Sequence, residues 1–403
     1  MAPSIREVAG GLLAPKGWKA AAACANIKGS TADKLDLGLL VSDTDCSAAG
    51  VFTQNQVRAA PVRWCQQLLP AANVRAVIAN SGNANACTGE QGYRDAADMA
   101  GEAALAIGVD PSQVLVASTG VIGVPMPMQR LLSGIRGLRL GADGDAFNDA
   151  IITTDTRRKQ ASVALEIGGR EVRVGGVSKG AGMIHPNMAT MLCFITADAA
   201  VDLALLPGAV KRAADRSFNM LTVDGDTSTN DTLVVLCNGA AGNPPIRPGT
   251  PEAAVLEEAI ETVALSLARQ MAADGEGASK ALEVRVSGAA SEDDARAAAR
   301  AVASSNLVKC AIYGNDPNWG RILCALGNTS VRLDESRVGI SVNGQRLVAC
   351  GVSTAFDGGA ASQAMKAPLV TIDVELGLGS GQATALGCDM TPDYVTFNAD
   401  YTT

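Results

Sequence analysis

The chain has 403 residues, of which 47% are hydrophobic but only 3% aromatic, and its formal net charge is −8. This length suits one large α/β domain with a smaller companion, and its core must be built mainly from aliphatic side chains. The acidic balance argues against nucleic acid as a partner, because phosphate binding requires basic patches. The sequence contains no apolar run long enough to cross a membrane and no signal-peptide core at its start, so we expect a cytoplasmic protein.

Short apolar runs alternate along the chain with segments of helical periodicity, and this alternation predicts a mixed α/β (α+β) fold. Gly168 and Gly169 separate two of the runs and predict a hairpin turn. Ser291 stands where a side-chain cap would begin a helix. The predicted strands are 38–41, 76–79, 114–117, 161–167, 170–174, 191–196 and 232–237. The predicted helices are 94–107, 127–135, 203–218, 251–273 and 292–304.

The texture of the sequence changes near residue 280. A strand at 281–286 is followed by an Ala-rich helix, and Asn343 and Gly344 predict a hairpin turn between apolar segments 338–342 and 347–349. A further strand is expected at 370–376. We therefore predict a larger domain of residues 1–280 and a smaller C-terminal domain of residues 281–403.

A glycine-rich loop runs from Lys179 into the Ala189–Thr190 bond, and the apolar run 191–195 follows at once. A hydroxyl at such a loop–strand junction suits a threonine that cleaves its own chain and then acts as an N-terminal nucleophile, with its freed α-amine as base. The chain contains one histidine, His185, so a histidine-dependent triad would have to use that residue. We interpret His185 as a residue that orders the loop.

Other loops rich in Gly, Asn, Asp and Thr follow predicted strands, where α/β proteins collect their sites. Thr119 and Gly120 could point a hydroxyl and a backbone N–H at one oxygen, as an oxyanion hole requires, although many ordinary turns contain Thr-Gly. No metal site is predicted: the aspartates of segment 223–232 lack the closing Glu of an EF-hand, and no CxxC pair occurs. The ten singly placed cysteines are expected to be reduced and buried.

Four of these segments together resemble the ornithine acetyltransferase (glutamate N-acetyltransferase) family of arginine biosynthesis. They are residues 80–86 (NSGNANA), 118–123 (STGVIG), 179–190 (KGAGMIHPNMAT) and 314–321 (GNDPNWGR). The resemblance extends over essentially the whole chain. It implies a layered α-β-β-α fold, similar to that of N-terminal-nucleophile hydrolases, with a smaller C-terminal α/β domain.

The resemblance also implies roles for individual residues. The precursor would cleave itself between Ala189 and Thr190 into an α chain of 1–189 and a β chain of 190–403, which assemble as an α2β2 heterotetramer. Thr190 would be the nucleophile, and Thr119 and Gly120 would form the oxyanion hole. The implied substrate-binding residues are Thr153, Lys179, Thr190, Glu276, Asn398 and Thr403.

The implied reaction moves the acetyl group of N2-acetylornithine to Thr190 and then to glutamate, in two half-reactions and without a cofactor. It stays open whether acetyl-CoA serves as a second acetyl donor and whether arginine or ornithine inhibits. Two alternatives remain. One is an N-terminal-nucleophile amidase or aminopeptidase that uses water as acceptor; the other is an amino-acid-binding sensor without activity.

Overall fold

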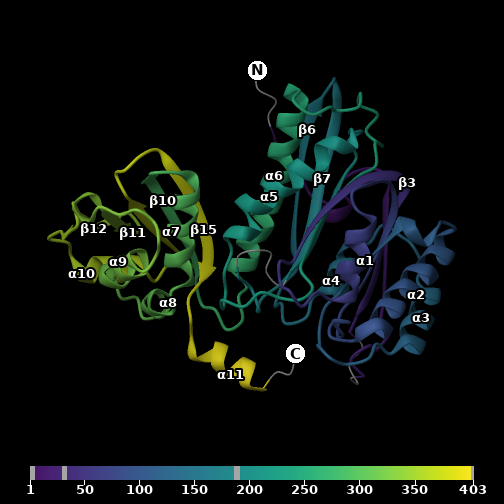
Figure 1. Cartoon of the computed structure of the whole chain (residues 1–403), viewed down its shortest axis with the longest axis horizontal. Coiled ribbons are helices and arrows are strands. Elements are labelled where there is room, and N and C mark those ends of the chain that lie inside the picture. The colour runs from purple at the N-terminus through teal and green to yellow at the C-terminus, as the bar shows by residue number, and fades with distance from the viewer. Residues whose placement is uncertain (1–4, 30–33, 186–190, 401–403) are drawn as a thin grey trace.

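The computed structural model describes residues 5–29, 34–185 and 191–400. Figure 1 shows a larger part built by the first two thirds of the chain and a smaller part beside it. The larger part contains a mixed sheet in the order β1-β6-β7-β8-β9-β3-β4-β5, with β2 paired to β3. Its strands are β1 (Arg6–Glu7), β2 (Trp18–Ala23), β3 (Leu37–Phe52), β4 (Ala71–Asn80), β5 (Val114–Ser118), β6 (Lys159–Ile167), β7 (Arg170–Lys179), β8 (Leu192–Ala197) and β9 (Thr232–Cys237).

Strand β3 joins two halves of this sheet. Its first residues pair with β4, its last residues from Ser47 to Phe52 pair with β9, and the β4 pairing shifts register between Val41 and Cys46. The sheet therefore bends at β3, and its two halves face each other across a common core.

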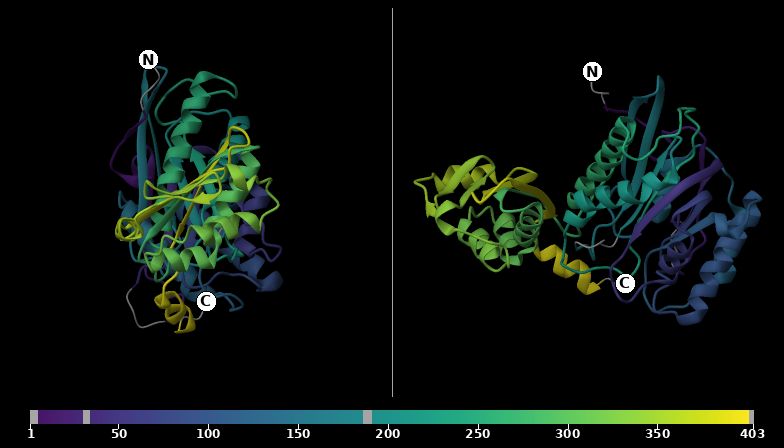
Figure 2. Two further views of the ribbon diagram at one scale, coloured as in Figure 1. Left: turned by 90° about the vertical axis from the view of Figure 1, so that its left-hand side faces the viewer. Right: turned by 45° about the horizontal axis from the view of Figure 1, so that its top comes forward.

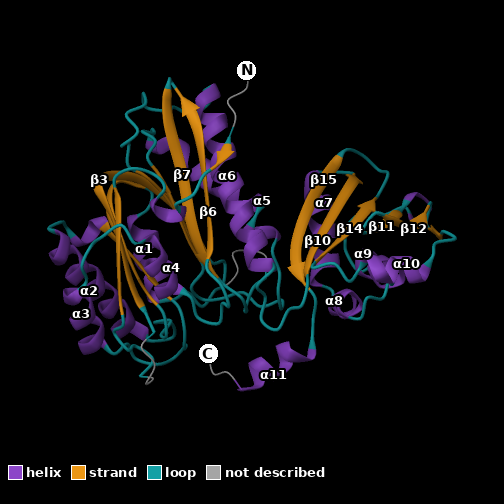
Figure 3. Cartoon of the chain, turned by 180° about the vertical axis from the view of Figure 1, so that it is seen from behind, coloured by secondary structure: helices purple, strands orange, loops and turns teal. Residues whose placement is uncertain are grey.

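That arrangement produces four layers, which Figure 3 shows from behind. One half is covered on its outer face by α5 (Leu206–Arg216) and α6 (Pro251–Ala272), and the other by α2 (Gly89–Ile107) and α3 (Met128–Gly137). Between the halves lies a core that includes Leu40, Phe194 and Leu236, together with side chains of α1 (Ala60–Leu68) and α4 (Gly144–Ile151). The predicted α/β fold with α-β-β-α layers is confirmed.

The central strands β8 and β9 have apolar residues at nearly every position because both of their faces are buried. On β8, Cys193 and Ile195 face α5 and α6, whereas Leu192 and Phe194 face the common core. The hairpin predicted at Gly168 and Gly169 is also confirmed, since β6 and β7 pair from Ile167 opposite Arg170.

The smaller part contains a second sheet in the order β13-β12-β11-β14-β10-β15. Helices α7, α8 and α9 cover one face of it with an aliphatic core. The Ser291 side chain caps α7 as predicted, accepting a hydrogen bond from the backbone of Asp294. The elements are β10 (Ala281–Ala289), α7 (Glu292–Ser304), α8 (Asn306–Tyr313), α9 (Trp319–Gly327), β11 (Gly339–Val342), β12 (Gln345–Ala349), β13 (Val352–Ser353), α10 (Gly358–Ala364), β14 (Leu369–Glu375) and β15 (Gly381–Cys388).

After β15 the chain leaves the second sheet and forms α11 (Pro392–Asp400), which extends back beneath the larger part (Figures 1 and 2). Two sheets are thus present, and the division into domains at residue 280 stays a prediction. In the part of the chain that the structure describes, no helix is long and apolar enough to span a membrane.

The ten cysteines are free thiols, and the expectation that they are buried is right for only half of them. Cys24, Cys87, Cys310, Cys324 and Cys350 are exposed. All five lie in loops, turns or helices at the surface.

Candidate active site

One pocket of the larger part brings together most of the residues singled out from the sequence. Thr119, Gly120, Thr153, Lys179, Glu276 and Asn398 all line it. The other lining residues are Ala84, Ile122, Thr154, Gly182, Met183, Asp224, Asp226, Ser228, Thr229, Asn230 and Tyr394. Ala189, Thr190 and Thr403 lie outside the described residues. His185 does not line the pocket, and its Nδ1 lies 3.2 Å from the Thr222 hydroxyl.

The loop after β5 carries Thr119 and Gly120 on a backbone that only glycine tolerates. Gly120 has a φ of 134°, and a Cβ there would lie 2.3 Å from the carbonyl carbon of Gly82. The Thr119 N–H donates to the backbone oxygen of Asn80 over 3.0 Å. The 80–86 segment therefore supports the Thr119 loop by direct backbone contact.

Buried side chains add further hydrogen bonds that hold the Thr119 loop. The Ser118 hydroxyl donates to Asn80 over 2.6 Å, and the Asn230 amide donates to the backbone oxygens of Ala84 (2.6 Å) and Ser118 (2.8 Å). Asn80, Ser118 and Asn230 are all buried. Buried amide and hydroxyl groups need hydrogen-bond partners, and here the partners are backbone and side-chain atoms of neighbouring loops. These bonds account for the polar composition of the loops.

Lys179 ends β7 and is 2% exposed, with its Nζ 3.1 Å from the Thr119 hydroxyl oxygen. A protonated lysine can only donate hydrogen bonds, so the Thr119 oxygen accepts and its own hydrogen is free to point elsewhere. Burial lowers the pKa of Lys179, and the nearby carboxylate of Asp155 opposes that effect.

Glu276 also lines the pocket, in the loop after α6. Its backbone N–H donates to the oxygen of Ala181 over 2.8 Å, and its carboxylate accepts from the Asn398 amide of α11 over 3.1 Å. A Cβ added to Gly182 would lie 2.1 Å from a carboxylate oxygen of Glu276, so the two residues are in close contact. The pocket is thus lined by a buried cation, Lys179, and by the carboxylate of Glu276.

Two aspartates that the sequence suggested only as members of a weak calcium-like cluster flank the predicted cleavage junction instead. Asp224 accepts from the backbone of Met183 (2.5 Å) and Ile184 (2.9 Å), before the junction. Asp231 accepts from the backbone of Met191 over 3.1 Å, directly after it. Burial raises the pKa of both carboxyl groups, that of Asp224 to about 6. Among the described residues, no group of three His, Cys, Asp or Glu side chains could hold a metal ion.

Comparison with known proteins places this geometry in context. The model of the ArgJ family matches residues 19–403. The arginine biosynthesis bifunctional protein ArgJ of Symbiobacterium thermophilum is 53% identical over 98% of this chain and 99% of its own length. The crystal structure of ArgJ from Bacillus halodurans is 42% identical with a TM-score of 0.51, over 52% of this chain and 98% of that one. A Mycobacterium tuberculosis ornithine acetyltransferase solved with ornithine is 40% identical, with a TM-score of 0.42, over 47% of this chain and 100% of that one.

Fold, pocket and relatives together define an enzyme of the acyltransferase class. The match of the family model to residues 19–403 and the identity above 50% make the assignment specific. The chain belongs to the ArgJ family.

Proposed function

We propose that this enzyme transfers the acetyl group of N2-acetylornithine to glutamate through an acetyl ester on Thr190. The observation that carries the proposal is the hydrogen bond from Lys179 to the Thr119 hydroxyl, beside Gly120, whose φ of 134° is one that glycine adopts without strain. Because the Thr119 oxygen accepts this bond, the Thr119 hydroxyl hydrogen is free to donate. In our proposal, this hydroxyl and the backbone N–H of Gly120 donate to the acetyl oxygen, which becomes negative during acyl transfer. Each such donor contributes about 3–4 kcal/mol of transition-state stabilisation.

In the first half-reaction, the Thr190 hydroxyl attacks the acetyl carbonyl while the α-amine of Thr190 takes its proton. The tetrahedral oxyanion accepts hydrogen bonds from Thr119 and Gly120. Its collapse breaks the amide bond, and the α-ammonium returns the proton to the departing amine of ornithine. In the second half-reaction, the amine of glutamate attacks the ester in the same way and leaves as N-acetylglutamate.

The charges of the pocket fit N2-acetylornithine. Lys179 uses one N–H on Thr119, which leaves two for an α-carboxylate. Glu276, which lines the same pocket, can pair with the side-chain ammonium of ornithine. Thr153 and Asn398 line the same pocket and would complete the binding site, with Thr403 following α11.

We further propose that the nucleophile is released by self-cleavage between Ala189 and Thr190. The strands on either side of the loop are paired, with Lys179 opposite Leu192, so the loop leaves and re-enters the sheet at the same level. The solved Bacillus halodurans ArgJ chain is about half as long as this chain, since 52% of this chain covers 98% of it. A half-length chain in a relative supports cleavage into an α and a β chain.

The family resemblance also supports an α2β2 heterotetramer in the cytoplasm that needs no metal or organic cofactor. Size-exclusion chromatography with light scattering tests the assembly. A mass corresponding to one α and one β chain would contradict the tetramer.

The function is tested by incubating purified protein with N2-acetylornithine, with and without glutamate, and analysing the products. We expect ornithine release to depend on glutamate and to match N-acetylglutamate formation one for one. Free acetate formed equally in both samples would identify a hydrolase and contradict the transferase. A third sample with glutamate and acetyl-CoA alone decides whether a second acetyl donor is used.

A further inference from the structure

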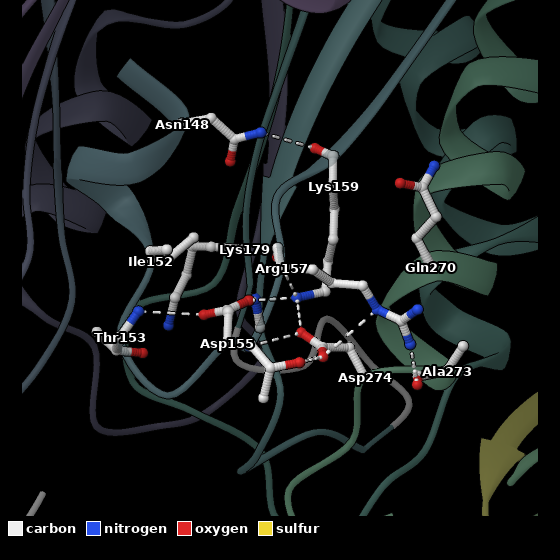
Figure 4. Close-up of polar contacts among 12 residues, drawn as sticks. Asn148, Ile152, Thr153, Asp155, Arg157, Lys159, Lys179, Gln270, Ala273 and Asp274 are labelled. Atoms are coloured by element: carbon white, nitrogen blue, oxygen red, sulfur yellow. Dashed lines mark hydrogen bonds and ion pairs between the residues drawn. The ribbon is translucent and has the colours of Figure 1, made fainter. Parts of the chain in front are cut away.

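A buried lysine behind the pocket carries a role that the sequence does not reveal. Lys159 begins β6, and its side chain is fully buried. Its Nζ lies 2.5 Å from Asp155 and 2.5 Å from Asp274, whose side chains are 0% and 2% exposed (Figure 4). Such a buried charge cluster is weak evidence for stability, because desolvation offsets most of the attraction. Its presence next to an active site therefore needs another reason.

Asp155 connects Lys159 to two segments of the pocket wall. One of its carboxylate oxygens accepts from the backbone N–H of Gly180 over 2.7 Å, next to Lys179. The other accepts from the backbone N–H of Thr153 over 3.1 Å. Burial alone would raise the pKa of Asp155, but the positive charges of Lys179 and Lys159 outweigh it and lower that pKa. Asp155 is therefore an anion that faces both lysines.

Asp274 connects Lys159 to a third segment. It follows α6, two residues before Glu276, and it accepts hydrogen bonds from the backbone (3.1 Å) and the hydroxyl of Thr156. Arg157 pairs with the same carboxylate and donates to the backbone oxygen of Ala273. Figure 4 shows the side chains of Asp155 and Asp274 converging on the Lys159 nitrogen.

We propose that Lys159 is a positioning residue for acyl transfer: through Asp155 and Asp274 it fixes the relative placement of the segments that carry Thr153, Lys179 and Glu276. The inference rests on the proposed function of that pocket. Lys179 sets the hydroxyl of Thr119, and Glu276 holds the far end of the substrate. An error of about 1 Å between these two groups displaces the acetyl carbonyl from the oxyanion donors, which can cost about 10²-fold in rate.

The test compares Lys159→Met with wild type in chain cleavage, thermal unfolding, and kcat and KM for N2-acetylornithine. We expect a cleaved, folded variant in which kcat/KM falls about 10²-fold, mostly through kcat. Lys159→Arg keeps the charge and donors for both carboxylates, and we expect it to recover at least about tenfold of that loss.

The matched control is Asp198→Asn. Asp198 is another fully buried charge that joins two segments, accepting from the backbone of Lys16 (3.0 Å) and Arg173 (2.7 Å). It follows β8 at the end of the sheet remote from Lys179, since Val174 pairs with Ala197 there. We expect it to lower the melting temperature without lowering kcat/KM.

Two results overturn the inference. One is a Lys159→Met variant with kcat/KM within about threefold of wild type; the other is an equal loss of kcat/KM in Asp198→Asn. If Lys159→Met does not fold, Asp274→Asn replaces it. The amide keeps an acceptor for Thr156 but loses the ion pair with Lys159. Unchanged kcat/KM in that variant overturns the inference as well. An inactive wild type would instead contradict the proposed function, so the two failures are distinguishable.

Discussion

At the scale of single residues, the chemistry depends on which way one hydroxyl points. Lys179 donates to the Thr119 oxygen, so the hydrogen of Thr119 is available to the substrate. Thr119→Val keeps the shape and removes that donor, and we expect kcat to fall about 10²-fold or more. Thr119→Ser keeps a hydroxyl and should retain most of the activity. Steady-state kinetics on both variants checks this, and equal activity in the two would contradict a donor role for Thr119.

A second residue gives a prediction about pH. Burial raises the pKa of Asp224 to about 6 in the folded protein, against an ordinary value of 3.8. The folded state then binds this proton more tightly than the unfolded state does. The stabilisation from this group is therefore fully present below the unfolded pKa and is lost as the pH rises through about 6.

Asp224→Asn cannot titrate, so the difference in unfolding free energy between wild type and this variant should shrink from pH 4 to pH 7. A shift of two pKa units corresponds to about 3 kcal/mol. Thermal or urea unfolding of both proteins across this range measures the difference. A difference that stays constant with pH would show that Asp224 ionises normally.

At the scale of elements, the loop after β7 contacts the loop after α6 where Gly182 meets Glu276. A Cβ on Gly182 would lie 2.1 Å from the Glu276 carboxylate, which can move because it is the end of a flexible side chain. We therefore expect Gly182→Ala to fold normally and to raise KM for N2-acetylornithine up to about fivefold, because a partly exposed ion pair contributes about 1 kcal/mol or less. The control is Gly101→Ala in α2, where a Cβ meets nothing within 4 Å. An unchanged KM in Gly182→Ala would place the Glu276 carboxylate outside substrate binding.

Periodicity in the sequence predicted the buried strands and the long helices. A strand buried on both faces has a continuous apolar run, and a helix buried on one face has an apolar stripe. It missed β2, whose Ala-rich sequence has no strand signal. It also predicted only the start of β3, because the apolar run ends at Val41 and the polar residues Ser42 to Asp45 follow it. In the structure they form the bend where the pairing with β4 shifts register. Short helices such as α1, α4 and α11 offer too few turns for periodicity to register.

The candidate site was harder to predict from the sequence than the fold was. Thr119, Lys179 and Glu276 come from three distant segments, and only the resemblance to a family joined them in advance. Lys159 belongs to no motif, and a lysine at the start of a strand ordinarily indicates an exposed position. Its burial is decided by Asp274, a residue more than a hundred positions later, so no local pattern could reveal it.

At the scale of the whole molecule, the two predicted chains share one sheet. Strand β7 of residues 1–189 pairs with β8 of residues 190–403, and β3 of the former pairs with β9 of the latter. The core around these strands is apolar, so the screening of charges by salt does not weaken it. We expect the cleaved chains to co-elute in 1 M salt, roughly the strength that screens surface ion pairs, and to separate only in denaturant. Separation on a salt gradient alone would contradict this interlocked arrangement.

The central claim is that acetyl transfer proceeds through Thr190, and one measurement tests it most directly. Wild-type enzyme is mixed with N2-acetylornithine without glutamate, quenched in acid, digested and analysed by mass spectrometry. We predict one acetyl group on the peptide that begins with Thr190, removable by hydroxylamine as an ester is, and lost when glutamate is added before the quench. Thr190→Ala should remain a single uncleaved chain without the acetyl group. An unmodified Thr190 peptide, together with intersecting rather than parallel double-reciprocal plots, would contradict the account and indicate direct transfer between the two substrates.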